Sequence, residues 1–288
     1  MEYAGFIFSI FHPSVFTFSD IAAWFLTTGG MITLFAFFGF SGLAIYQTRS
    51  RFNEKNQVFD PEEIVSENDG VEKILKKCRI QLIHFLNKTS SVYTFGIENF
   101  IAEDLPGFKN ILAEKDNLRK KVEKSKENIF SIATNFESSL HSGHYLIDIK
   151  DYQVRMVNSL SLFLDPMFEH LSNSHKPFIK VQGEELGLLK KEIDNLLVLS
   201  AEIINNNQVN EKNNMAGIQN KIYEMLNRME VAQIKRIKSN QVNTRNSILF
   251  LNILSETKNM LNHASGLLIS YNKLTSEAKT KTQTNERA

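Results

Sequence analysis

The sequence contains one cysteine, Cys78, in 288 residues. A single cysteine cannot form an internal disulfide, and it offers no cluster of thiolates for zinc. Proline is also scarce, with 5 residues, so the chain has few obstacles to long helices. The formal net charge is only +1, built from many charges of both signs. This balance does not indicate a nucleic-acid-binding protein.

The sequence also lacks the motifs of the common enzyme classes. It has no P-loop, no Gly-x-Ser-x-Gly and no His-Glu-x-x-His, and its cysteine has no catalytic histidine context. The pattern Asp/Glu-x-x-x-Asp, which places two carboxylates on one helix face for a metal cluster, does not occur either. We therefore expect neither enzymatic activity nor a cofactor.

One long segment lacks charge altogether. Residues 21–48 contain no Asp, Glu, Lys or Arg. As a helix they would be about 42 Å long, enough to cross a hydrocarbon core of about 30 Å. Trp24 and Tyr46 lie near its two ends, where interfacial aromatics anchor a span, and Arg49 and Arg51 follow it. We expect a transmembrane helix with its C-terminal side in the cytoplasm, the alternative being a buried core helix.

The flanking segments complete the predicted domain organisation. Residues 1–20 are apolar and too short for a full span, which predicts an interfacial or partial membrane segment. Residues 49–70 are a polar linker by composition. We expect a helical bundle over residues 71–274 and a disordered polar tail over residues 275–288.

The bundle is predicted from apolar residues that recur at steps of three and four in six successive stretches. Breaks between the stretches fall at residues 105–107, 138–143, 176–177, 205–214 and 239–241. Pro166 lies inside the third stretch, where we expect it to kink the helix. The fold class is therefore all-α, with an N-terminal transmembrane helix followed by a six-helix antiparallel bundle, which can be divided into two three-helix halves.

Two groups of residues are candidate sites. His144, Asp148 and Asp151 share one helix face and are weak candidates for a metal site, although a polar surface with acids at a helix start explains them more simply. A second group is a set of four cations that could contact an anion or an acidic partner: Lys235, Arg236, Lys238 and Arg245. Its alternative role is to place favourable charge at the C-terminus of the fifth helix.

Two stretches carry a resemblance to a known family. They are "SGHYLIDIKDYQVRMVNSLSLFLDPMFEHLSNSHKPF" at residues 142–178 and "QIKRIKSNQVNTRNSILFLNILSETKNMLNH" at residues 233–263. Together they resemble the cytoplasmic PhoU-like domain fused to the C-terminus of certain bacterial inorganic phosphate transporters of the PiT family. "AAWFLTT", at residues 22–28, looks like the start of the last membrane region of those transporters.

The resemblance implies a membrane-anchored cytoplasmic regulatory domain of a phosphate symporter, coupled to sodium or protons, in the bacterial inner membrane. Its implied partners are the transporter's transmembrane core, the lipid bilayer and a second copy of the chain, without nucleic acid. The Gly-Ala-Asn-Asp-type motifs of the transport core are missing. We therefore expect the chain to be the C-terminal part of a transporter or a separate subunit, and we assign no phosphate ligand.

A second hypothesis remains open. The even charge and the lack of a ligand motif also suit a stand-alone, membrane-tethered helical module for interaction or signalling.

Overall fold

The computed structural model describes residues 71–140, 143–206 and 212–285, and all the elements among them are helices. The chain divides into two units, Met1–Gln57 and Val58–Ala288, and every described residue belongs to the second. The helices are α4 (Val71–Ile101), α5 (Leu105–Leu140), α6 (Gly143–Ser172), α7 (Lys180–Asn206), α8 (Lys212–Lys238) and α9 (Thr244–Asn285). The predicted all-α class and the six helices are confirmed for this part of the chain.

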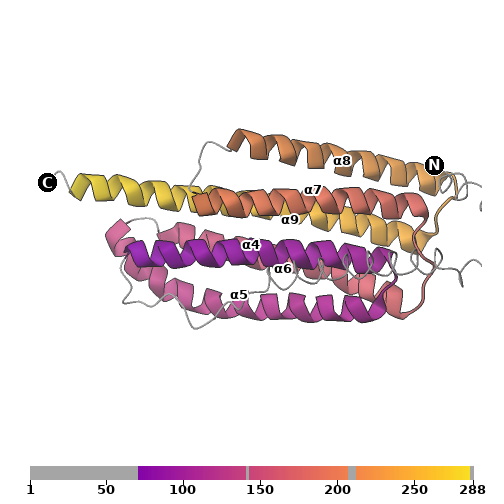
Figure 1. Cartoon of the computed structure of the whole chain (residues 1–288), viewed down its shortest axis with the longest axis horizontal. Coiled ribbons are helices and arrows are strands. Elements are labelled where there is room, and N and C mark those ends of the chain that lie inside the picture. The colour runs from indigo at the N-terminus through magenta and orange to yellow at the C-terminus, as the bar shows by residue number, and fades with distance from the viewer. Residues whose placement is uncertain (1–70, 141–142, 207–211, 286–288) are drawn as a thin grey trace, which may run out of the picture. The chain divides into compact units, whose positions relative to one another are not determined.

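The six helices form two three-helix halves (Figure 1). Helix α5 packs on α4 and α6 in the first half, and α8 packs on α7 and α9 in the second. The halves meet where α4 contacts α7 and α6 contacts α9, so α5 and α8 lie on opposite outer sides of the bundle. The second half therefore repeats the packing of the first, helix for helix.

The apolar stripes of the sequence form the core of this bundle. Leu82, Phe85, Leu160, Leu164 and Phe250 are each at most 3% exposed. Removing one such side chain from water contributes about 1.5–3 kcal/mol, so each helix is held mainly by the stripe that it buries. One buried polar contact crosses between the halves, because the hydroxyls of Tyr93 and Thr257 lie 3.0 Å apart in α4 and α9.

Short turns join the helices at the end where α4, α6 and α8 finish (Figure 1). Each turn contains a residue other than glycine with positive φ: Glu103 at 54°, Ser174 at 50° and Asn240 at 54°. In each case the left-handed residue ends the preceding helix, as glycine commonly does. Asp104 then begins α5 by accepting the Gly107 N–H at 3.0 Å, a standard N-cap.

Pro166 does not interrupt α6, which continues to Ser172. Proline has no N–H, so it cannot donate to the carbonyl of Leu162 four residues earlier. Asn252 of α9 donates its side-chain Nδ2 to that carbonyl at 2.8 Å. The hydrogen bond lost inside α6 is thus replaced by one between α6 and α9, the pair that joins the two halves.

The C-terminal boundary of the bundle differs from the prediction. Helix α9 runs to Asn285, so residues 275–285 are helical and the polar tail predicted from residue 275 is wrong over this range. These residues contain neither glycine nor proline. A helix already stabilised by the core can therefore continue, because each further residue adds a hydrogen bond without a new nucleation cost.

The predicted membrane segments cannot be compared with the structure. Residues 1–20, 21–48 and 49–70 all lie outside the described residues. Within the described ranges, no helix is both long enough and apolar enough to cross a bilayer.

The contact between Asn252 and α6 can be tested with a double-mutant cycle. We expect Asn252→Ala to lower the free energy of unfolding by about 1 kcal/mol, because it leaves the Leu162 carbonyl unpaired. In a Pro166→Ala background the same change should cost less than about 0.5 kcal/mol, because residue 166 then supplies an N–H. Chemical denaturation of the four proteins measures both values. Equal costs in the two backgrounds would show that Asn252 does not act through this carbonyl.

Candidate functional site

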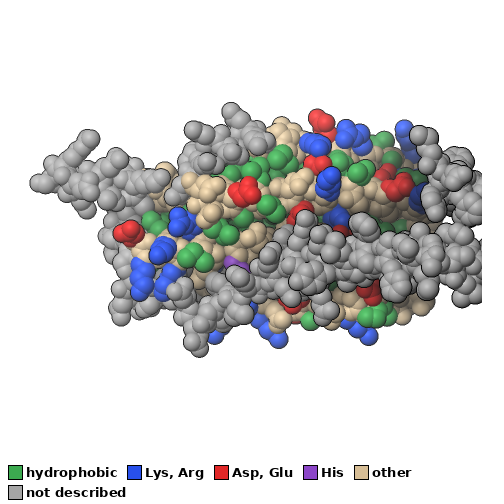
Figure 2. Space-filling model, in the orientation of Figure 1, with side chains coloured by type: hydrophobic (Ala, Val, Ile, Leu, Met, Phe, Trp, Pro, Cys, Tyr) green, Lys and Arg blue, Asp and Glu red, His purple; other side chains and the backbone are tan. Residues whose placement is uncertain are grey.

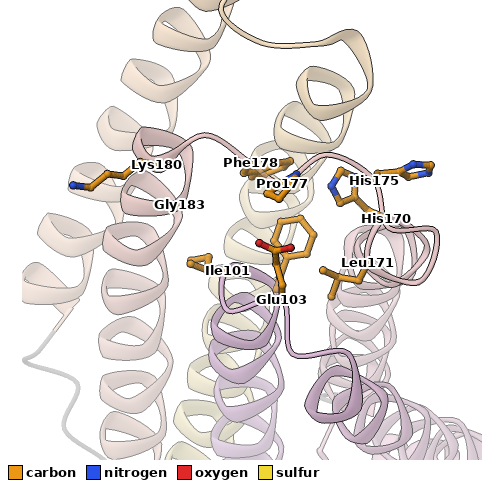
Figure 3. Close-up of a pocket in the computed structure, with 10 residues that line it drawn as sticks. Ile101, Glu103, His170, Leu171, His175, Pro177, Phe178, Lys180 and Gly183 are labelled. Atoms are coloured by element: carbon orange, nitrogen blue, oxygen red, sulfur yellow. The ribbon is translucent and has the colours of Figure 1, made fainter. Parts of the chain in front are cut away.

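Two adjoining hollows lie at the end of the bundle where α4, α6 and α8 finish, which we call the turn end. Both are lined by His170 and His175. The inner pocket, of about 150 Å³, lies between the end of α4 and the α6–α7 turn. The outer groove, of about 690 Å³, lies between the end of α6 and the start of α9. Figure 3 shows the side chains that line the inner pocket. The inner pocket also includes Phe100, Ile101, Glu103, Leu171, Pro177, Phe178, Lys180 and Gly183.

The α6–α7 turn is fastened to the start of α9 by Asn246, which is 3% exposed. Its Nδ2 donates to the carbonyls of Lys176 at 3.1 Å and Pro177 at 2.9 Å. Its backbone N–H donates to Oδ1 of Asn243, the N-cap of α9, at 2.7 Å. Because the side chain and the backbone of one residue bind two segments, the turn and the helix start are positioned together.

The Lys176 carbonyl also contacts the side chain of His170. Its Nε2 lies 3.1 Å from the Lys176 oxygen, and a carbonyl can only accept, so Nε2 carries the hydrogen. Burial lowers the pKa of His170 below its ordinary value of 6.5 and outweighs the opposite effect of this hydrogen bond. The ring is therefore neutral near pH 7. Its Nδ1 is then an acceptor, and it has no hydrogen-bond partner.

Three rings form one wall of the inner pocket. The centroid of Phe100 lies 5.6 Å from that of His170 and 5.0 Å from that of Phe178. His170 and Phe178 are 5.8 Å apart, and Phe178 continues to Phe250 in the core at 5.9 Å. Edge-to-face and tilted contacts at these distances are favourable for aromatic rings. The pocket wall is therefore continuous with the hydrophobic core.

The charged side chains around the pocket point in different directions. Figure 3 shows the Glu103 carboxylate directed into the pocket beneath Pro177 and Phe178, whereas Lys180 extends away from it. The Lys180 amine instead lies 3.8 Å from Glu184. Arg245 contacts the ring of His175. The charge that faces the inner pocket most directly is thus the negative charge of Glu103.

The four predicted cations have different positions. Arg236 is 7% exposed and donates two hydrogen bonds to the Glu185 carboxylate, at 3.0 and 2.7 Å. It also lies 5.4 Å from the centre of the Phe250 ring and donates to Gln233 at 2.9 Å. Its guanidinium is therefore engaged inside the bundle. Lys235 and Lys238 are exposed at the end of α8, and Arg245 lines the outer groove.

The weak metal candidates lie near the start of α6, away from the two hollows. His144 and Asp148 are exposed, and Asp151 accepts from Arg155 at 2.6 Å. Across the described ranges, no three His, Cys, Asp or Glu side chains are placed to hold a metal ion. The predicted membrane anchors lie outside the described residues: Trp24, Tyr46, Arg49 and Arg51.

The local sequence pattern does not single out Glu103 or His170. His170 and Asn246 do fall within the two stretches that carry the family resemblance. Their partners are backbone carbonyls or rings that lie far away in sequence, and no spacing rule connects residue 103 with residues 170–178.

Comparisons with known proteins add no assignment. No protein-family model, no curated protein and no solved structure matches the chain.

Because Arg236 is paired inside the bundle whereas Lys238 is exposed, we expect substitutions of these two cations to have unequal effects on stability. We expect Arg236→Met to lower the free energy of unfolding by about 2–3 kcal/mol, because Glu185 and Gln233 lose their buried partner. Lys238→Met, on the exposed side of the same helix end, should change it by less than about 0.5 kcal/mol. Urea denaturation compares the two variants. Similar effects in both would argue against a structural role for Arg236.

The lowered pKa of His170 predicts how stability changes with pH. Below pH 6.5 the unfolded chain binds a proton that the folded protein still excludes. This contribution is therefore complete above pH 6.5 and is lost as the pH falls through the folded-state pKa. We expect the midpoint of thermal unfolding to fall less between pH 7.5 and pH 5.5 in His170→Gln than in the unaltered protein. An equal fall in His170→Gln and in the unaltered protein would contradict the prediction.

Proposed function

We propose that the chain is a membrane-anchored, cytoplasmic PhoU-like regulatory domain of an inorganic phosphate transporter. The observation that carries the proposal is that the two stretches with the family resemblance contact each other in the fold. Within the first stretch, residues 143–178 form α6 and most of the following turn, and residues 233–263 include the end of α8 and the first half of α9. Asn246 and Asn252 of the second stretch bind backbone carbonyls of the first.

This contact supports the proposal because the resemblance rests on residues that one fold uses jointly. A chance similarity in sequence would not be expected to fall on the two segments whose polar side chains connect the halves of the bundle. The two three-helix halves are also compatible with the six-helix bundle that the resemblance implies.

The proposed mode of action is contact between helices and a membrane partner. In this proposal residues 21–48 anchor the chain in the bacterial inner membrane, and the bundle lies on the cytoplasmic side. The partners are the transmembrane core of a phosphate symporter, the bilayer and a second copy of the chain. The bundle would change transport by favouring one state of the core over another, which requires different contacts in the two states.

A stand-alone interaction module is the second candidate. The observation that favours it is the exposed apolar surface beside the outer groove, where Ile248 is 65% exposed and Leu162, in the adjoining helix, is 56% exposed. Exposed apolar groups of this size, among polar neighbours, are common in protein-binding surfaces. On the face that Figure 2 shows, the charge has no single sign, because Lys and Arg lie among Asp and Glu over α7 and α8.

Deleting residues 71–285 while keeping residues 1–70 tests the first proposal. In the cells that produce this protein, we expect the deletion to change the rate of phosphate uptake, or the phosphate concentration at which uptake is reduced. The matched control is Lys191→Met, at an exposed position of α7 outside the candidate contacts, which should leave uptake unchanged. Unchanged uptake with the deletion, at equal transporter abundance, would reject the proposal.

Cross-linking of the full chain in membranes distinguishes the two candidates. Recovery of a phosphate permease core as the cross-linked partner supports the transporter domain. Recovery of a sensor kinase or another signalling protein, without a permease, supports the stand-alone module.

A further inference from the structure

One stretch of the bundle carries charge of only one sign. Residues 231–255 contain four cations and neither Asp nor Glu, although the whole chain has nearly equal numbers of acidic and basic residues. Arg236 is neutralised inside the bundle. Lys235, Lys238 and Arg245 are exposed, and within the described ranges none of them forms an ion pair. Three uncompensated positive charges therefore lie at the end of α8 and the start of α9.

Three exposed isoleucines belong to the same stretch. Ile234 and Ile237 of α8 are 47% and 40% exposed, and Ile248 near the start of α9 is 65% exposed. Clustered apolar side chains with polar residues around them mark sites of contact with proteins or membranes. Here the surrounding charges are all positive, which favours a partner with negative charge.

The antiparallel packing of α8 and α9 brings these residues to one end of the bundle. The side chain of Gln219 donates to Ser265, and that of Tyr223 donates to Asn262. Continued along the two helices, this register places residues 234–237 of α8 level with the first two turns of α9. Helix α8 is also one of the two outermost helices, so an extended surface can approach its exposed side (Figure 1).

We propose that the end of α8 and the start of α9 form a docking surface for an anionic lipid bilayer. The isoleucines enter the boundary between lipid headgroups and acyl chains, and Lys235, Lys238 and Arg245 contact lipid phosphates. Amphipathic helices with Lys and Arg beside an apolar face bind membranes in this way. Each cation close to an anionic membrane surface adds to the attraction.

Charge and chemistry favour a bilayer over other occupants. A nucleic acid would satisfy the cations but would leave the isoleucines exposed to water. A second copy of the chain, joined through the same surface, would place like charges opposite one another. A bilayer supplies both the apolar acyl chains and the anionic phosphates that this surface requires.

The inference deepens the proposed function, because it rests on the membrane anchor of that proposal and names the part of the bundle that meets the membrane. There, residues 21–48 anchor the chain and residues 49–70 connect the anchor to α4. A connection of this length reaches about 75 Å when extended, whereas α4 is about 46 Å long. The turn end can therefore meet the bilayer although α4 begins at the opposite end of the bundle.

The test uses the full chain in lipid vesicles that contain no other protein. Ile237→Cys is labelled with bimane, and a nitroxide-labelled lipid quenches the dye on contact. Cys78 is buried and should not react, which labelling of the unaltered chain checks. With about 30% phosphatidylglycerol in the vesicles, we expect about twofold quenching, against little in phosphatidylcholine alone. Leu188→Cys, an equally exposed apolar site beside Glu184 on α7, should show little quenching in either lipid.

Two pairs of lysine variants make the test specific to this surface. Lys235→Gln combined with Lys238→Gln should reduce the quenching at residue 237 by about half, because two of the three cations are lost. Lys109→Gln combined with Lys120→Gln removes the same charge from α5, on the opposite outer side of the bundle, and should leave the quenching unchanged. All four lysines are exposed, so neither pair should prevent folding.

The proposal is overturned if bimane at residue 237 is not quenched, or is quenched equally with and without phosphatidylglycerol. It is also overturned if the α5 pair reduces quenching as much as the α8 pair does. A blue shift of the emission without quenching would show that a second copy of the chain, and not lipid, covers the surface. Because the vesicles contain no transporter, these failures would leave the proposed role in phosphate uptake standing. Unchanged uptake after deletion of the bundle would likewise leave the lipid contact standing.

Discussion

The arrangement of the turn end depends on one buried amide. Asn246 holds the carbonyls of Lys176 and Pro177, so the α6–α7 turn stays against the first turn of α9. The same Lys176 carbonyl accepts from His170, and this contact determines which imidazole nitrogen keeps its hydrogen. Pro177 leads directly into Phe178, whose ring joins the pocket wall to the core. Without this amide, the Pro177 carbonyl would lose its side-chain donor and the Lys176 carbonyl would keep only His170, at a cost of about 1 kcal/mol.

Apolar packing and polar contacts between helices contribute differently to the fold. The stripes of leucine, isoleucine and phenylalanine supply most of the driving force, but such surfaces can slide past one another at little cost. Hydrogen bonds that cross between helices penalise a shift, because a shift leaves their buried atoms unpaired. The Tyr93–Thr257 contact, the Gln182–Gln233 contact and the bond from Asn252 to α6 each connect different helix pairs. Together they favour one register among several that the apolar pattern allows.

The two ends of the bundle differ in chemistry. The end of the bundle with the short turns collects buried polar atoms, aromatic rings and the exposed Glu103 carboxylate next to two hollows. The start of α6, at the opposite end, carries His144 and Asp148 as exposed surface residues. A regulatory bundle needs a place where a signal changes its contacts, and the turn end offers both a pocket and exposed apolar surface beside it.

The sequence alone determined the helical class, the number of helices and most of their buried faces, because these follow from local periodicity and from the positions of turns. Local pattern did not determine the end of α9, since a polar segment without glycine or proline can either continue a helix or leave it. Only the tertiary structure decided that Arg236 is engaged inside the bundle by Glu185 whereas Arg245 lines a groove, although both belong to one basic cluster in the sequence. It also decided that Glu103, His170 and Phe178 share a pocket. The physical reason is the same in each case: these relations join residues on different helices, and their positions depend on how the helices pack.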